Sequence, residues 1–252
     1  MNNDIIRFPT TNDGASHGLL DDVRRRLDVV DPSDVQSLRV AVSELARGHL
    51  LRALLVALVA DERELTLIAG RSYLHGNGFH KLELLRHAGF KVRLHVWQLG
   101  TPAEENIHDH RWAFASHVLV GELRSEVFVD DTHGEVACAE HCYVSRTADT
   151  APSQCRVGRA RLRCTERNVR RAGTTYSMTP DLLHRIEHTG HRFVSTLMVS
   201  APPLGGQSRL LIEEGRKVDP DVAALPLTLT EARTCLIENL QHMNRGDNTW
   251  VS

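Results

Sequence analysis

The chain has 252 residues, of which 41% are hydrophobic and 25% are charged, and its formal net charge is −2. This composition is typical of a globular protein, and the small net charge does not favour a nucleic-acid-binding surface. The longest apolar run, residues 50–60, is interrupted by Arg52 and falls short of the roughly 20 residues that span a bilayer. We therefore expect neither nucleic acid nor membrane among the partners.

The cysteine and histidine contents set two further expectations. Five cysteines are irregularly spaced, and the N-terminus lacks a basic segment followed by an apolar run, which favours a reduced, cytoplasmic protein. The 15 histidines are many for this length. Because imidazole is a common metal ligand and titrates near neutral pH, this excess points to metal or acid–base chemistry.

The first part of the chain has a helical pattern. Residues 1–15 are expected to form a flexible arm, and residues 16–69 an N-terminal helical segment. Within that segment, leucine and valine recur at spacings of three or four residues, which is typical of amphipathic helices. Pro32 is expected to end the first helix, and Gly48 to break the next one.

From residue 70 to residue 205 the pattern changes to short strands. Residues 91–99 alternate between polar and apolar side chains, as in a half-buried strand. Turn signals at Asn77-Gly78 and at Gly121 separate such segments. Many short strands with regular turns predict a mainly β fold, either a sandwich or a barrel.

Residues 206–252 are expected to form a C-terminal extension. Thr228 and Glu231 have the spacing of a capping box, in which each side chain bonds the backbone of the other residue. This signal predicts a terminal helix over residues 229–243.

The stretch after residue 105 contains a His-x-His pair. Alternate residues of a strand project to the same face, so His108 and His110 can bind one ion together. A third ligand must then come from another part of the chain.

Two segments resemble the two metal-binding motifs of the cupin superfamily. His108 and His110 match the paired histidines of the first motif, and Gly121 stands where its closing glycine belongs. His184 follows Gly173 at the spacing of the histidine in the second motif. The resemblance covers roughly half of the chain. It implies a double-stranded β-helix (jelly-roll) barrel over residues 70–205, flanked by the N-terminal helical segment and the C-terminal helix.

The sequence departs from the cupin pattern in both motifs. In the second motif, Pro180 is one place late and Asp181 replaces a glycine. In the first motif, Phe114 stands where the family has a glutamate ligand, and a phenyl ring cannot bind a metal. Phe114 is expected to fill the space of that glutamate and to line the pocket.

Without that carboxylate, the resemblance implies a metal site of three histidines, namely His108, His110 and His184. This ligand set is similar to that of the thiol dioxygenases, cysteine dioxygenase among them, which hold mononuclear non-haem Fe(II) and leave positions open for substrate and O₂. The resemblance therefore implies an Fe(II)-dependent, dioxygenase-like oxidoreductase acting on a small organic molecule. The strand after His184 lacks the Ser-x-His-x-Tyr arrangement of that branch, so a thiol substrate is not implied.

Other functions stay open on the same residues. Zn²⁺, Ni²⁺ or Mn²⁺ on the three histidines would act as a Lewis acid in a hydrolase, isomerase or lyase. A third option is a barrel that binds a small molecule without turnover. Many cupins pair through their barrels, which leaves a homodimer open. His117 is an alternative ligand, although the motif register places Ser116 inward and His117 outward.

The strand before the first motif supplies candidate catalytic residues. If Arg93 and His95 face inward, they offer a cation and an acid–base group, and Arg93 would suit a carboxylate-bearing substrate. We expect this inward orientation rather than one with Val92 and Leu94 inward. The remaining residues expected in the substrate pocket are Trp97, Trp112 and Lys81.

The segment of residues 131–172 contains four cysteines and many arginines. The cysteine spacing fits no zinc ribbon or finger, and the arginines are expected on a solvated strand face. Its role is left open by the sequence.

Overall fold

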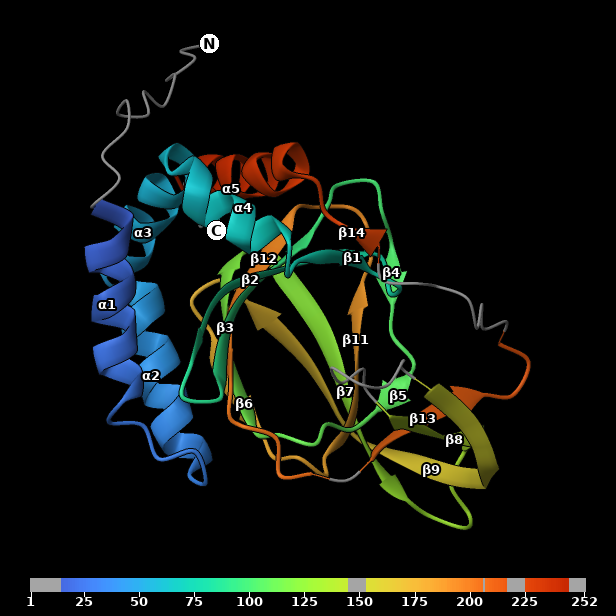
Figure 1. Cartoon of the computed structure of the whole chain (residues 1–252). Coiled ribbons are helices and arrows are strands. Elements are labelled where there is room, and N and C mark those ends of the chain that lie inside the picture. The colour runs from blue at the N-terminus through green and yellow to red at the C-terminus, as the bar shows by residue number, and fades with distance from the viewer. Residues whose placement is uncertain (1–14, 145–152, 206, 217–224, 245–252) are drawn as a thin grey trace, which may run out of the picture.

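The computed structural model of the chain describes residues 15–144, 153–205, 207–216 and 225–244 (Figure 1). It begins with four helices: α1 (Ala15–Leu27), α2 (Val35–Arg47), α3 (His49–Ala60) and α4 (Glu62–Ala69). Asp34 and Asp61 start α2 and α4 by accepting hydrogen bonds from backbone N–H groups of the first turn. The expected break at Gly48 separates α2 from α3.

One seven-stranded antiparallel sheet, which we call sheet A, lies against these helices (Figure 1). In spatial order its strands are β10 (Thr175–Met178), β6 (Phe114–Val120), β12 (Val194–Ser200), β3 (Phe90–Trp97), β2 (Phe79–His87), β1 (Tyr73–His75) and β14 (Leu225–Pro226). Val92, Leu94 and Val96 of β3 join the leucines of the helices in the largest apolar core. Burial of this shared apolar surface holds the helices on the outer face of the sheet.

The C-terminal helix α5 (Leu229–Asn244) also packs over sheet A, beside α3 and α4. Thr228 and Glu231 form the predicted capping box, since the backbone N–H of Glu231 donates to Thr228 Oγ1 at 3.2 Å and Thr228 N–H donates to Glu231 Oε2 at 2.7 Å. Among the described residues, no helix has the length and apolar character needed to cross a membrane.

A second seven-stranded sheet, sheet B, faces sheet A. In spatial order it contains β4 (Ala103–Glu104), β11 (Leu183–His188), β5 (Ile107–His108), β13 (Ser208–Glu213), β8 (Val136–Val144), β9 (Ser153–Arg171) and β7 (Glu122–Asp130). β7 also pairs with β11, so six of these strands close into a ring. We call this ring, formed by β5, β13, β8, β9, β7 and β11, the side barrel. Its β8–β9 hairpin projects on the side away from the helices (Figure 1).

The side barrel has a small core of its own. This core consists of Ile107, Phe128, Cys138, Leu162, Leu183 and Leu211. Arg185 binds Glu126 and Glu213 at 2.5 and 2.7 Å beside it. Arg209 binds Asp130 and Glu140 in a second cluster, with distances of 2.8 and 2.7 Å. On each of β7, β11 and β13 these charged residues alternate with the apolar ones on one face, so arginine–carboxylate clusters flank the apolar layer.

The predicted mainly β fold, with helices before the strands and one helix after them, is confirmed. Gly121 does not form a hairpin turn as its sequence context suggested, because it joins β6 of sheet A to β7 of sheet B. Its φ is +74°, and a Cβ at this position would lie 2.6 Å from the Phe193 carbonyl oxygen, so only glycine fits. Strands β13 and β14 lie beyond residue 205 and still belong to the two sheets. Of the arm expected at residues 1–15, only Ala15 is described, and it begins α1.

Candidate metal centre

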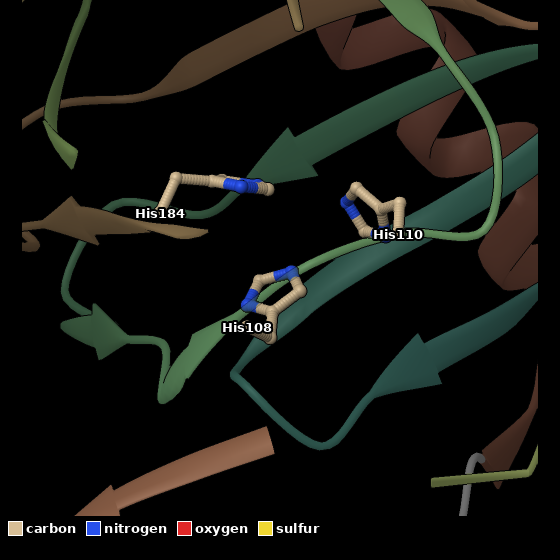
Figure 2. Close-up of side chains that lie close together, drawn as sticks. All are labelled: His108, His110 and His184. Atoms are coloured by element: carbon tan, nitrogen blue, oxygen red, sulfur yellow. The ribbon is translucent and has the colours of Figure 1, made fainter. Parts of the chain in front are cut away.

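Three histidines converge between the two sheets. His108 of β5 and His184 of β11 are direct neighbours across a strand pair, and His110 follows two residues after His108. Their ring centroids lie 4.6 to 5.1 Å apart, and one nitrogen of each ring lies within 4.8 Å of the others. Figure 2 shows the three imidazoles facing a common space.

The hydrogen bonds of two of these histidines fit metal binding. His108 Nδ1 lies 2.9 Å from the Asn106 carbonyl oxygen, and His184 Nδ1 lies 2.9 Å from the Leu182 carbonyl oxygen. A carbonyl only accepts, so each Nδ1 carries the proton and each Nε2 keeps its lone pair.

Burial keeps the rings of His184 and His110 neutral. Desolvation, with a smaller contribution from His108, lowers the pKa of His184 to about 3. Desolvation followed by His108 and His184 places the pKa of His110 well below its usual value. Because a protonated imidazole cannot bind a metal, this environment favours the ligand form at neutral pH.

Aromatic rings, rather than a carboxylate, complete the surroundings of the three histidines. The Phe114 ring lies 5.2 Å from that of His110 and 5.9 Å from that of His184, between ring centroids. Trp112 stacks on His110 at 5.2 Å. The structure therefore places Phe114 against the histidine cluster, as expected from its position in the motif.

No acidic or cysteine side chain of the described residues joins this group. Among the described residues, His108, His110 and His184 form the one set of at least three histidine, cysteine or acidic side chains close enough to share an ion. Asp109 points away and accepts a hydrogen bond from the Arg209 backbone N–H at 2.7 Å. The cysteines of residues 131–172 form no such set within the described residues.

A cavity with about 570 Å³ of space, partly continuous with solvent, opens beside the three histidines. Arg93, His95 and Trp97 line it, which confirms the inward orientation expected for this strand. Its walls also include the other expected pocket residues Lys81, Trp112 and Phe114. The structure thus brings all of the predicted site residues together around one cavity.

The two candidate catalytic residues, Arg93 and His95, differ in their polar partners. Arg93 Nη1 donates to Ser200 Oγ at 3.3 Å, and Arg93 Nε lies 3.9 Å from a Glu83 carboxylate oxygen. His95 Nε2 is buried and has no hydrogen-bond partner within the part of the chain that the structure describes. Desolvation, aided by Lys81 and Arg93, places the pKa of His95 well below its usual value, so this imidazole is neutral.

His117 lies on the opposite face of β6 from the cavity. Its Nδ1 is 2.6 Å from Thr175 Oγ1, and its side chain is buried. Desolvation followed by Arg47 lowers the pKa of His117 to about 4. His117 is therefore a satisfied interior residue, and the alternative in which it binds the metal does not fit this geometry.

The sequence did not reveal that Tyr176 lines the cavity. It lies on β10 at the edge of sheet A, where it pairs with Ser116 across the strands. The Arg170 guanidinium lies 4.1 Å from the centre of its ring. Tyr176 lies three residues after Gly173, on the strand that leads toward His184. This position in the sequence could have indicated that Tyr176 lies near the site.

The chain was compared with protein families, curated proteins and solved structures. No family model and no curated protein matches the chain. Similar solved structures include an oxalate oxidase bound to the substrate analogue glycolate, with 16% identity, a TM-score of 0.31, and coverage of 52% of this chain and 54% of that chain. Hydroquinone 1,2-dioxygenase in complex with Cd²⁺ and 4-hydroxybenzonitrile matches at 11% identity and a TM-score of 0.29, over 48% of this chain and 63% of that chain.

A third match is an RmlC-like cupin from Shewanella frigidimarina, with 14% identity, a TM-score of 0.30, and coverage of 53% of this chain and 84% of that chain. The chain thus spans about half the length of the oxalate oxidase. At these TM-scores the likeness supports no argument about activity, substrate or metal.

Proposed function

We propose that the protein is a mononuclear non-haem Fe(II)-dependent oxygenase, of the dioxygenase type, that acts on a small organic molecule. The observation that carries this proposal is the convergence of three imidazoles at one end of a cavity, with no carboxylate in the cluster. Three protein ligands leave coordination positions for other molecules, as in oxygenases with a facial triad. Iron bound there would supply the activation of O₂, which organic molecules cannot achieve readily by themselves.

The chain's own residues prepare the site in three ways. The carbonyls of Asn106 and Leu182 fix the tautomers of His108 and His184, so that both Nε2 atoms face the common space. Phe114 and Trp112 cover His110 with apolar surface and keep that side dry. The cavity on the sheet A side is left for the substrate.

His95 is the proposed acid–base and orienting group. Its neutral ring can hold a proton on one nitrogen and accept one on the other, and its unpartnered Nε2 is available to the substrate. Arg93, which interacts with Glu83 and Ser200, is assigned to positioning the cavity wall.

A second candidate function is Lewis-acid catalysis by Zn²⁺, Ni²⁺ or Mn²⁺ at the same histidines, in a hydrolase, isomerase or lyase. The donor set favours this option specifically for zinc, because three histidines with one open position form a water-activating zinc site. A small-molecule-binding barrel without turnover is the remaining alternative.

Metal loading separates these functions. Metal-free protein would be loaded under anaerobic conditions with Fe²⁺ or with Zn²⁺ and mixed with a panel of small carboxylic acids. We expect O₂ consumption, with oxidised product detected by mass spectrometry, only in the iron-loaded protein. Turnover of any panel compound by the zinc-loaded protein without O₂ would instead establish the second function.

A further inference from the structure

The ammonium of Lys81 lies in the cavity, where the carboxylates of Glu105 and Glu83 act on it only at longer range. Lys81 is on β2, directly opposite His95 of β3, and both side chains face the cavity. Among the described residues, its ammonium has no hydrogen-bond acceptor and no carboxylate at ion-pair distance. Its nearest recorded contact is the Tyr73 ring, whose centre lies 5.7 Å from Nζ. Lys81 is half-buried, and an ammonium without a direct partner at such a position favours a ligand that compensates its charge.

The other charges of the cavity are already engaged. Arg93 interacts with Glu83 and donates to Ser200. Glu105 also lines the cavity, but its Oε2 accepts the Ile186 backbone N–H at 3.3 Å. Arg93, the residue that the sequence suggested for a carboxylate, thus has direct polar partners, whereas Lys81 interacts with Glu105 and Glu83 only at longer range.

We propose that Lys81, together with the N–H of the neutral His95 beside it, binds the carboxylate of a small monocarboxylic acid substrate. This inference rests on the proposed function only in assigning the anion to the substrate. One unbalanced cation matches a monoanion better than a phosphate dianion, which needs more donors. Desolvation, with a smaller contribution from Arg93, lowers the pKa of Lys81 to about 7, and a bound carboxylate would restore its charged form.

The neighbouring wall indicates the rest of the substrate. Phe79 and Trp97 stack with their ring centroids 4.8 Å apart, and His75 stacks on Phe79 at 4.7 Å. These rings line the cavity beside Lys81 and His95. An aromatic surface of this kind favours an apolar or aromatic body attached to the carboxylate.

Calorimetric titration of the zinc-loaded protein tests the site without O₂ chemistry. The probes are benzoate, its neutral isostere benzamide, acetate and inorganic phosphate. We expect benzoate to bind at least ten times more weakly to Lys81→Met than to the wild type, since a charge-assisted hydrogen bond is lost. Lys91→Met is the matched control, because Lys91 lies on the same sheet outside the cavity. It should leave benzoate binding unchanged, and benzamide and phosphate should bind weakly to all three proteins.

Thermal unfolding of the ligand-free proteins provides a second readout. Lys81→Met should unfold at a higher temperature than the wild type because it removes an unpaired charge. A purely structural lysine would give the opposite shift. Loss of benzoate affinity in Arg93→Met but not in Lys81→Met would overturn the proposal, as would failure of both benzoate and acetate to bind the wild type. Intact benzoate binding without iron-dependent O₂ uptake would refute the proposed oxygenase and leave the anion site standing.

Discussion

Charged and polar side chains gather in two regions of the molecule, the side barrel and the histidine cavity. The two regions differ in how completely these groups are paired. In the side barrel, the half-buried Arg185 and Arg209 each bind at least two carboxylates beside an apolar layer. In the histidine cavity, among the described residues, Lys81 has no carboxylate at ion-pair distance and His95 Nε2 has no hydrogen bond. Paired charges are typical of a structural region, whereas polar groups without a partner point to a ligand. This difference indicates that the side barrel stabilises the fold and that the cavity binds a ligand.

The largest expected effect tests the core of the side barrel. Phe128→Ala should lower the free energy of unfolding by about 3–5 kcal/mol, because it removes a fully buried ring from a small core. Urea unfolding measures this loss. Val129→Ala is the control, since Val129 is 37% exposed, and it should change stability little. Equal effects of the two substitutions would mean that the side barrel has no core of its own.

The next effect concerns His117, the histidine outside the cavity. Its pKa is about 4 in the fold and near 6.5 in the unfolded chain, so the unfolded chain binds the extra proton between these values. Stability should therefore be complete above pH 6.5 and decline as the pH falls toward 4, by up to about 3 kcal/mol from this residue. Urea unfolding at pH 7 and pH 5 should show a smaller decline in His117→Gln than in the wild type. An identical decline would show that His117 is readily protonated in the fold.

Arg185 should contribute less than Phe128. Arg185→Met leaves Glu126 and Glu213 without their shared cation, and we expect a loss of about 1–2 kcal/mol at pH 7. Burial raises the pKa of Glu126, but Arg185 and Arg167 outweigh it and hold the pKa below its usual value, so protonation at low pH should shrink this loss. Arg167→Met, which removes an exposed partner of the same carboxylate, should cost under about 0.5 kcal/mol in the same assay.

The smallest effect on stability is expected in the cavity. His95→Gln should change the free energy of unfolding by less than about 1 kcal/mol, because His95 Nε2 has no protein partner to lose. The same substitution should weaken benzoate binding in the titration. A large loss of stability would contradict the view that His95 is kept for a ligand rather than for the fold.

Local signals in the sequence predicted the cavity more fully than the side barrel. The pair His108 and His110 could be read from its spacing, whereas His184, 76 residues after His108, was placed beside it by the resemblance to two family motifs. The alternation over residues 91–99 left two possible faces, since a shift of one residue exchanges them. The prediction that Arg93 faces inward assumed that polar side chains line the cavity, and in the structure Arg93 does line it.

The side barrel could not be predicted in the same way. It closes through the pairing of β7 with β11, two segments about 60 residues apart in the chain, and through a bulge at Val127 and Phe128. The arginines of residues 153–171 were therefore expected on a solvated face, although Arg170 lies over the Tyr176 ring. The unpaired state of Lys81 also depends on where Glu83 and Glu105 point, which no local pattern records.

The central claim is that His108, His110 and His184 hold one metal ion. The most direct test is the metal content of protein purified without a histidine tag, measured by mass spectrometry for the wild type, His184→Ala and His117→Gln. We predict near-stoichiometric divalent metal in the wild type and in His117→Gln, and its loss in His184→Ala. Equal metal content in wild type and His184→Ala, or loss of metal in His117→Gln alone, would contradict the account.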